Sequence, residues 1–167
     1  RHDPKQLLSM ILADATRLVG TKHGFIYMLN KDREVFHRTH GLGLYEKDLG
    51  REIPATEGIV GLVRRTGQPA SVNDYPAWKS NNPDSVQFEE IRAILQIPLK
   101  SESQVMGTIG LAYCESGKAF GVEEIATLRR FADLASIALD NATLLDSYSH
   151  EVTERREAEA SVQAMIN

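Results

Sequence analysis

The apolar positions in the last third of the chain follow a helical spacing that extends past the size of a small globular domain. They step by three or four residues and are Ile125, Leu128, Ala132, Ala135, Leu139, Ala142 and Leu145, then Val152, Val162 and Ile166. A helix from Val122 to Asn167 would be roughly 68 Å long at ~1.5 Å per residue, whereas a small domain is ~30 Å across. Beyond Leu145 no remaining part of the chain could cover this stripe, so a coiled coil with a second copy is expected.

A second helical stripe opens the chain. Asp3 and Pro4 form an N-cap and first-turn pair, and apolar side chains then recur with helical spacing from Leu7 to Val19. Gly20 follows directly and is the residue type that commonly ends a helix. The sequence therefore predicts a first helix that ends at Gly20.

Between the two helices, short apolar runs bounded by polar turns predict five strands, over residues 25–29, 35–39, 70–73, 93–99 and 105–113. A short helix capped by Thr56 and ended by Gly67 is expected before the third strand. Residues 74–83 are rich in turn formers and predict a loop, and Phe88 with Ile91 suggests about one helical turn.

This order of elements predicts an α+β fold. A central antiparallel sheet should carry the N- and C-terminal helices on one face, with loops and short helices on the other. Residues 4–145 would form the domain, and residues 146–167 a coiled-coil helix that leads to a downstream module. A chain that begins Arg-His-Asp-Pro is expected to be a piece of a longer protein.

Composition and charge limit the classes of partner. Hydrophobic residues make up 42% and charged residues 25% of the chain, and the net charge is -4. With no basic face to meet a phosphate backbone, nucleic-acid binding is not expected. No apolar run approaches the ~20 residues that cross a bilayer, so membrane contact by this chain is not expected either. The single cysteine, Cys114, excludes an internal disulfide and favours a cytoplasmic location.

One cluster of aromatic residues is the candidate ligand site. Aromatic rings in a loop over a sheet can close on a small molecule while a carboxylate orients it. From the loop these residues are Trp78, Tyr75, Asp74 and Phe88, and from the sheet Tyr27, Phe36 and Tyr113. The alternative is that the loop is a lid packed on itself, with Asp74 bonding its own turn.

Other candidate chemistry is given a structural explanation. Cys114 lies at the end of an apolar strand and is expected to be a packing residue. His37 and His40 are three apart in a strand, so their side chains point to opposite faces and cannot share a metal ion. Neither a metal site nor a catalytic residue is predicted.

Several short motifs follow one another along the chain. In order, they are Glu57-Gly58-Ile59-Val60-Gly61, Thr66-Gly67-Gln68-Pro69, Val72-Asn73-Asp74, Ile97-Pro98-Leu99, Val105-Met106-Gly107-Thr108-Ile109-Gly110, and Phe120 before Glu123-Glu124. In this order and spacing the chain resembles the GAF domain family over roughly Lys5 to Leu145. The resemblance implies a small-molecule sensing and dimerisation module of bacterial signalling proteins. The run from Glu154 to Ala160 is similar to the charged connector of sensor histidine kinases in two-component systems.

The expected function is therefore non-catalytic sensing, relayed through the last helix to an output domain, expected to be a histidine kinase. The ligand and any cofactor stay unidentified. The alternatives are a pure dimerisation module with a vestigial pocket, and a redox enzyme on the same scaffold. The expected partners are a second copy, joined through the terminal helices, and the downstream module. The predicted dimer contacts are Leu128, Ala135, Leu139, Ala142, Leu145 and Val152, although the part from Leu128 to Leu139 could instead pack on the domain's own sheet.

Overall fold

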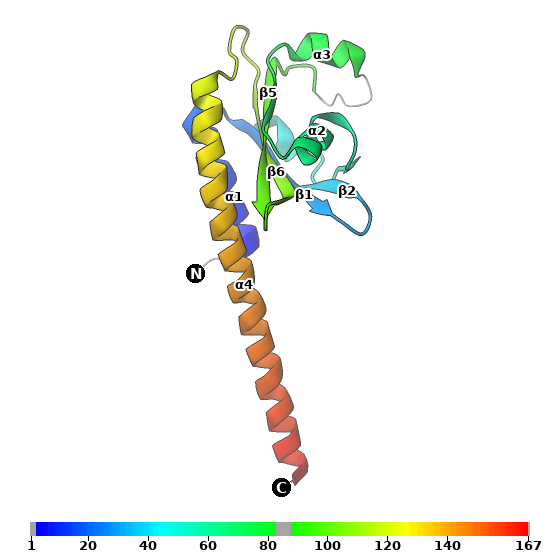
Figure 1. The fold of residues 1–167 in the computed structure, drawn as a ribbon, viewed down its shortest axis with the longest axis vertical. Helices are drawn as coiled ribbons and strands as arrows, with labels where there is room; N and C mark the ends of the chain where they lie inside the picture. The colour runs from blue at the N-terminus through cyan, green and yellow to red at the C-terminus, as the bar shows by residue number, and fades with distance from the viewer. Residues whose placement is uncertain (1–2, 83–87, 167) are drawn as a thin grey trace.

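The computed structural model describes residues 3–82 and 88–166, without the side chains of residues 143 and 145–147. Its central element is a six-stranded antiparallel sheet in the order β3-β2-β1-β6-β5-β4 (Figure 1). The strands are β1 (His23–Asn30), β2 (Val35–Leu42), β3 (Glu52–Pro54), β4 (Ala70–Val72), β5 (Ala93–Ser101) and β6 (Gln104–Tyr113). The helices are α1 (Pro4–Val19), α2 (Gly58–Thr66), α3 (Tyr75–Asn81) and α4 (Val122–Ile166), with a 3₁₀ turn, η1 (Gly43–Glu46).

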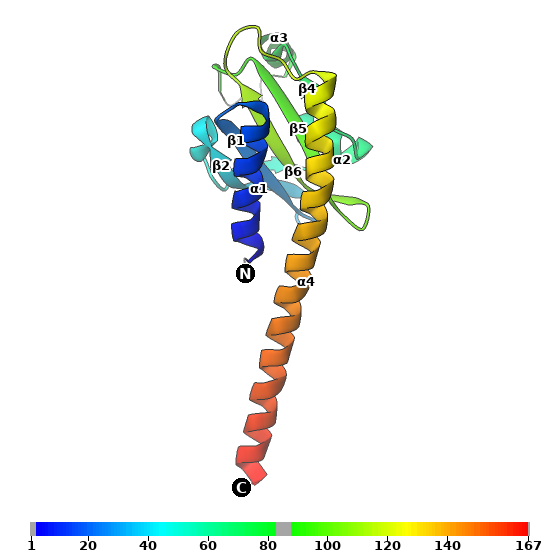
Figure 2. The same cartoon turned by 90° about the vertical axis from the view of Figure 1, so that its left-hand side faces the viewer.

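The two faces of the sheet bury different partners, as the α+β prediction requires. α1 and the first half of α4 lie side by side on one face (Figure 2). α2 and α3 lie over the other face (Figure 1). Because side chains alternate along a strand, β5 contributes residues to both faces of the sheet. Leu95, Ile97 and Leu99 belong to the core under α1 and α4, whereas Ile94 belongs to the core on the opposite face.

Helix ends follow the capping signals in most places. Asp3 caps α1 by accepting a bond from the Gln6 N–H at 2.8 Å, and Gly20 ends the helix in the left-handed conformation with φ 69°. Gly67 ends α2 in the same way with φ 66°. The predicted cap of α2 was wrong, because Glu57 rather than Thr56 is the N-cap residue and its side chain makes no capping bond.

Two further local predictions were wrong. Residues 75–81 form α3 instead of a loop, because Asp74 caps the helix by accepting a bond from the Ala77 N–H at 3.2 Å and Pro76 suits the first turn. Phe88 and Ile91 do not form a helical turn; Ile91 is buried in a connection beside the sheet. The short edge strand β3 was not predicted.

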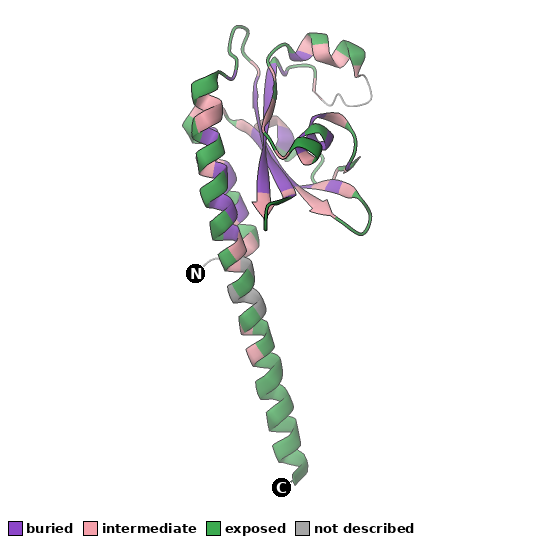
Figure 3. Cartoon of the chain, viewed as in Figure 1, coloured by how far each residue is buried: buried purple, intermediate pink, exposed green. Residues whose placement is uncertain are grey.

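α4 is one helix of 45 residues whose two halves have different surroundings. Its first half packs on the sheet, and its second half extends away from the domain, where most of the described side chains are exposed (Figure 3). Leu128 (1% exposed), Ala135 (6%) and Leu139 (2%) are buried against their own subunit, so their prediction as dimer contacts was wrong. The alternative, that this stripe packs on the domain's own sheet, is correct for these three residues.

The rest of the predicted dimer stripe lies where the helix leaves the domain or beyond it. Ala142 and Val152 are half-buried, and the side chain of Leu145 lies outside the described part of the chain. None of the helices in the described ranges is both long and apolar enough to cross a membrane.

The close approach of Phe25 to Gly110 gives a test of the packing behind the candidate site. These residues are paired across β1 and β6, and the Phe25 ring occupies the space that a Cβ at position 110 would need. Gly110→Ala should therefore displace the ring and lower the free energy of unfolding by about 1–3 kcal/mol in urea denaturation. Gly121→Ala is the control, since its Cβ would meet only the movable Glu124 carboxylate at 3.2 Å. Equal stability of both variants would contradict this packing.

Candidate functional site

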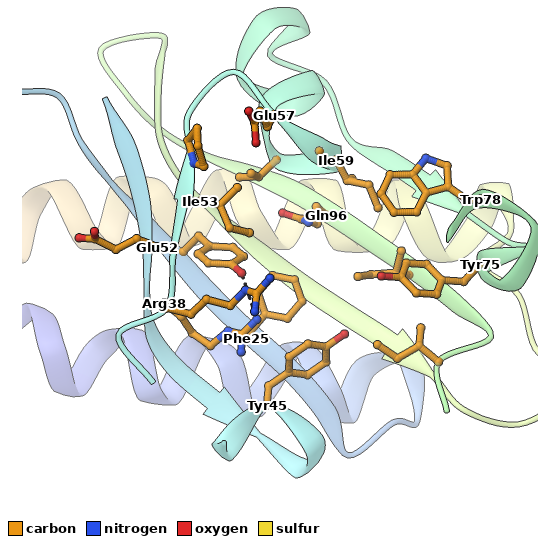
Figure 4. A pocket seen from close by; sticks show the side chains of 17 residues that line it. Phe25, Arg38, Tyr45, Glu52, Ile53, Glu57, Ile59, Tyr75, Trp78 and Gln96 are labelled. Atoms are coloured by element: carbon orange, nitrogen blue, oxygen red, sulfur yellow. Dashed lines mark hydrogen bonds between the residues drawn. The ribbon is translucent and has the colours of Figure 1, made fainter. Parts of the chain in front are cut away.

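A cavity of about 130 Å³ lies between the sheet, including its edge strand β3, and the layer formed by α2 and α3 (Figure 4). It is on the opposite side of the sheet from α1 and α4. Aromatic and aliphatic side chains form most of its wall, with a few polar groups among them. The lining residues are Phe25, Tyr27, Arg38, Tyr45, Arg51, Glu52, Ile53, Pro54, Glu57, Gly58, Ile59, Val60, Tyr75, Trp78, Ile91, Ile94 and Gln96.

A buried guanidinium group stands at one end of this cavity. Arg38 of β2 is 2% exposed, and its guanidinium carbon lies 5.3, 5.3 and 4.9 Å from the ring centroids of Phe25, Tyr27 and Tyr45. One nitrogen, Nη2, donates to the Tyr27 hydroxyl at 3.0 Å. Ring faces attract a cation, so the three rings help to hold this charge away from water.

The hydroxyl of Tyr45 is a buried polar group that lacks a hydrogen-bond partner among the described residues. Tyr45 belongs to η1 and is 2% exposed. Burial raises the pKa of its hydroxyl well above the ordinary value, which keeps the proton in place as a donor. A buried hydroxyl without a hydrogen-bond partner typically costs ~1–3 kcal/mol of stability. A ligand acceptor at this point would supply the missing hydrogen bond.

Gln96 supplies a further polar group from the middle of β5. Its side chain is 5% exposed, and its Oε1 accepts a hydrogen bond from the Thr108 hydroxyl at 2.9 Å. Because the oxygen is used in this way, the amide nitrogen is the end that can donate toward the cavity. Tyr45 and Gln96 therefore both present donors.

The other end of the cavity is aromatic. Tyr75 and Trp78 of α3 are stacked with ring centroids 5.5 Å apart. At the β3 side, the Glu52 carboxylate accepts two bonds from Arg33 at 2.6 and 2.9 Å on the surface of the protein. Figure 4 shows Glu52 directed away from the group formed by Arg38, Phe25 and Tyr45.

Three of the seven residues predicted for the ligand site, Tyr27, Tyr75 and Trp78, line the cavity. Asp74 does not, because its carboxylate is exposed and caps α3. Phe88 packs edge-on against the Tyr45 ring, 5.2 Å between centroids, and so supports the wall without forming it.

The two remaining strand residues also lie outside the cavity lining. Phe36 is fully buried where β2 pairs with Ile53 of β3, in the core around the cavity. Tyr113 lies on the opposite face, where it stacks on Phe120 and donates to the Val19 carbonyl at 2.6 Å. Its assignment was wrong because neighbouring strand residues point to opposite faces, and the sequence alone did not fix that register.

Sequence reasoning missed Arg38, Tyr45 and Gln96. Gln96 carried a usable signal, since it is the one polar residue in the apolar run from Ala93 to Leu99. Arg38 has the same parity in its strand as the buried Phe36, which would have placed both on one face. Nothing in the sequence around Tyr45 indicates that its hydroxyl is buried.

Cys114 is half-buried, and burial together with Glu115 and Glu90 raises the pKa of its thiol. A reactive thiolate needs the reverse environment. Within residues 3–82 and 88–166, no three His, Cys, Asp or Glu side chains gather as a metal site.

A family model of the GAF domain matches residues 1–140, which is most of the chain. This chain is a GAF domain. GAF domains are small-molecule sensing and regulatory modules of signalling proteins, and the cavity on the sheet is consistent with that general role.

Curated relatives of this GAF domain include the phosphoenolpyruvate-dependent phosphotransferase system proteins of Escherichia coli K12 and Salmonella typhimurium LT2. Each is 30% identical over 105 residues, covering 60% of this chain. The chain spans only 14% of the length of these relatives.

Solved structures share the fold at lower identity. The GAF-B domain of DevS from Mycobacterium smegmatis superimposes with a TM-score of 0.73 at 18% identity, covering 87% of this chain and 99% of that one. The GAF domain of a phosphoenolpyruvate-protein phosphotransferase from Coxiella burnetii gives 0.73 at 18% identity, with 88% of each chain covered.

Tyr27 and Tyr45 make a matched pair for a stability test without ligand. Tyr45→Phe removes a hydroxyl that lacks a partner among the described residues, so the free energy of unfolding should stay within about 0.5 kcal/mol or rise. Tyr27→Phe removes the acceptor of an Arg38 hydrogen bond and should lower the free energy of unfolding by about 1–3 kcal/mol. Urea denaturation of both variants measures the difference. A loss in Tyr45→Phe as large as that in Tyr27→Phe would show that the Tyr45 hydroxyl is already bonded.

Proposed function

We propose that this GAF domain senses a small molecule in the cavity beside Arg38 and Tyr45 and relays its occupancy through α4 to an output module. The observation that best supports this proposal is that β5 borders both the cavity and α4. Ile94 and Gln96 line the cavity, while Leu95, Ile97 and Leu99 pack in the same core as the buried stripe of α4.

A polar contact accompanies this packing between β5 and α4. The Lys100 N–H donates to the Ser136 hydroxyl at 3.1 Å, and that hydroxyl donates to the Ala132 carbonyl within α4 at 2.7 Å. A shift of β5 would therefore change the position of α4 as well as the cavity wall. A ligand can drive such a shift only as far as its affinities for the two arrangements differ.

The cavity limits the chemistry of the ligand. A volume of about 130 Å³ is small beside the ~300–1,000 Å³ of drug-sized sites. The donors of Tyr45 and Gln96 favour oxygen acceptors, and a carboxylate is the strongest of these because hydrogen bonds to an ionised acceptor are about twice as strong as neutral ones. The ligand is then a small organic acid, or a molecule that inserts its acidic end.

The output module is proposed to be a histidine kinase, with a homodimer through the terminal helices as the signalling unit. Support comes from the charged connector over residues 154–160 and from the long α4. A phosphotransferase is the second candidate output, because the 30% identical relatives are phosphotransferase system proteins.

Binding can be tested with acetate, pyruvate, malonate and succinate as probes, and with a cyclic nucleotide for comparison. At least one acid at millimolar concentration should raise the melting temperature, since a ligand that binds only the folded state stabilises it. Tyr45→Phe should weaken that binding about 5- to 30-fold, the loss of one hydrogen bond to a charged acceptor of ~1–2 kcal/mol. Ser80→Ala, in the exposed part of α3, is the matched control and should bind normally.

The result also separates this proposal from the alternative of a vestigial pocket. If no probe shifts the melting temperature while the protein is a dimer in solution, the chain is a dimerisation module. Binding that is unchanged in Tyr45→Phe would place the ligand elsewhere.

A further inference from the structure

A second pocket, of about 370 Å³, opens on the surface where α2 ends beside the β1–β2 and β5–β6 turns. It shares no lining residue with the cavity beside Arg38, so it is a separate site from that of the proposed function. Its volume falls within the ~300–1,000 Å³ range of small-molecule sites. Leu29 and Val105 give it some apolar surface, but most of its wall is polar. We propose that this pocket binds the phosphate group of a small, soluble phosphate monoester between Arg65 and Lys31.

Basic side chains from three separate elements meet at this pocket. Arg64 and Arg65 belong to the last turn of α2, and Lys31 belongs to the turn between β1 and β2. Lys100 of β5 lies beside the pocket wall, with its Nζ 3.6 Å from the point that a Cβ on Gly67 would occupy. Basic residues often end a helix because they complement its dipole, which explains the two arginines. It does not explain why lysines from two other elements lie at the same place.

Most of this positive charge is not neutralised by the protein. Arg64 donates two bonds to the Glu34 carboxylate, both at 3.0 Å, so this pair adds no net charge. By contrast, Arg65, Lys31 and Lys100 have no ion-pair partner in the described part of the chain. The described residues that line the pocket include no acidic side chain. An anion in the pocket would therefore meet three positive charges that are still available.

The number and shape of these groups favour a phosphate over a carboxylate. A phosphate monoester carries a charge of about -1.5 to -2 at pH 7, whereas a carboxylate carries a single charge. The planar fork of Arg65 can donate to two phosphate oxygens at once, and Lys31 can add a point charge. The Lys31 Nζ also donates to the Gln104 Oε1 at 3.3 Å. Because that oxygen is used, the amide nitrogen of Gln104 is a further donor for a phosphate oxygen.

The carbonyl groups at the end of α2 do not oppose this binding strongly. Free carbonyl oxygens at a helix end repel an anion, but two of them are already bonded here. The Gly67 N–H donates to the Val63 carbonyl at 2.8 Å, and the Thr66 hydroxyl donates to the Leu62 carbonyl at 2.9 Å. The partial negative charge of a helix end is about half an elementary charge, which is less than the charge of Arg65 alone.

The β5–β6 turn places a serine at the pocket in a backbone conformation that favours glycine. Glu102 and Ser103 are the two central residues of this turn, with φ values of 52° and 67°. Such two-residue turns usually contain Asn-Gly or Gly-Gly, because a side chain is disfavoured at positive φ. Ser103 lines the pocket, so its hydroxyl lies where a bound phosphate could accept a hydrogen bond from it.

Binding can be measured by isothermal titration calorimetry on the full 167-residue chain, with inorganic phosphate and glycerol 3-phosphate as probes and glycerol as the control without phosphate. Both phosphates should bind at millimolar concentration or below, and glycerol should not bind. Arg65→Gln and Lys31→Gln should each weaken phosphate binding about fivefold or more, because each removes a hydrogen bond to a charged acceptor. If neither phosphate binds, or if both variants bind as the starting protein does, the proposal is wrong.

Arg33→Gln is the matched control, because it removes one positive charge from the same turn as Lys31. The Arg33 guanidinium is bonded to Glu52 at 2.6 and 2.9 Å and does not line the pocket. Its loss should leave the affinity for phosphate within about twofold, since exposed charges that make no direct contact are screened by salt. Weakening equal to that in Lys31→Gln would mean general charge attraction rather than a site.

Ser103→Gly separates a binding role from a structural one. Glycine accepts a positive φ without strain, so the melting temperature should stay the same or rise. The affinity for phosphate should nevertheless fall about two- to fivefold, because the hydroxyl donor is lost. An unchanged affinity would contradict the placement of the phosphate group at this turn.

Vesicles distinguish a soluble ligand from a lipid headgroup with the same chemistry. Phosphatidylcholine vesicles that contain phosphatidic acid present a phosphate monoester on a membrane surface. The chain should stay in the supernatant when these vesicles are sedimented, because its net charge of -4 opposes approach to an anionic surface. Binding to the vesicles without binding of glycerol 3-phosphate would assign the pocket to a lipid and overturn the proposal.

Discussion

The packing of the α4 stripe against β5 is the contact on which the rest of the structure depends. It is made by Leu128, Ala132, Ala135 and Leu139 on the helix and by Leu95, Ile97 and Leu99 on the strand. Because these residues are nearly inaccessible to water, the helix cannot rotate on the sheet without exposing apolar area at about 25 cal/mol per Å². The outward direction of every later residue of α4 is then set, since the helix continues without a break to Ile166. The sheet thus determines which side of the rod is free to meet another molecule.

The packing of α4 on β5 also affects the cavity, because the opposite face of β5 borders it. A strand alternates its side chains, so Ile94 and Gln96 line the cavity while Leu95 and Ile97 pack on the side of α4. Gln96 sits between Leu95 and Ile97 in this alternation, and its position relative to Thr108 depends on the same strand pairing that holds the α4 side. The occupancy of the cavity and the position of α4 therefore both depend on the position of β5. A small displacement is expected to be transmitted because close-packed cores resist continuous deformation.

The elements with strong local signals could be predicted from the sequence, and those decided by longer-range packing could not. Asp3 with Pro4 correctly marked the start of α1, and the apolar runs correctly gave the central strands. The Asp74 and Pro76 pair is the same kind of signal, but the aromatic and polar residues after it favoured a loop, and α3 was missed. In the site, three of the seven predicted residues line the cavity. Tyr113 failed because of strand parity and Asp74 because it caps α3, whereas Phe36 and Phe88 pack in the core around the cavity without lining it.

The predicted dimer stripe shows most clearly why an apolar pattern alone does not tell which surface of a helix each residue occupies. From Leu128 to Leu139 the apolar steps alternate between four and three residues, but Leu139, Ala142 and Leu145 are separated by two steps of three in succession. Two such steps rotate the apolar face by about 60° each around a helix of 3.6 residues per turn, so the pattern leaves one face and joins another. Interpreted as one stripe, it merged a core-facing surface with an outward one. The sheet separates them, because it covers the first and leaves Leu134 and Tyr148 exposed. One helix is thereby part of a domain core on one side and exposed to solvent on the other.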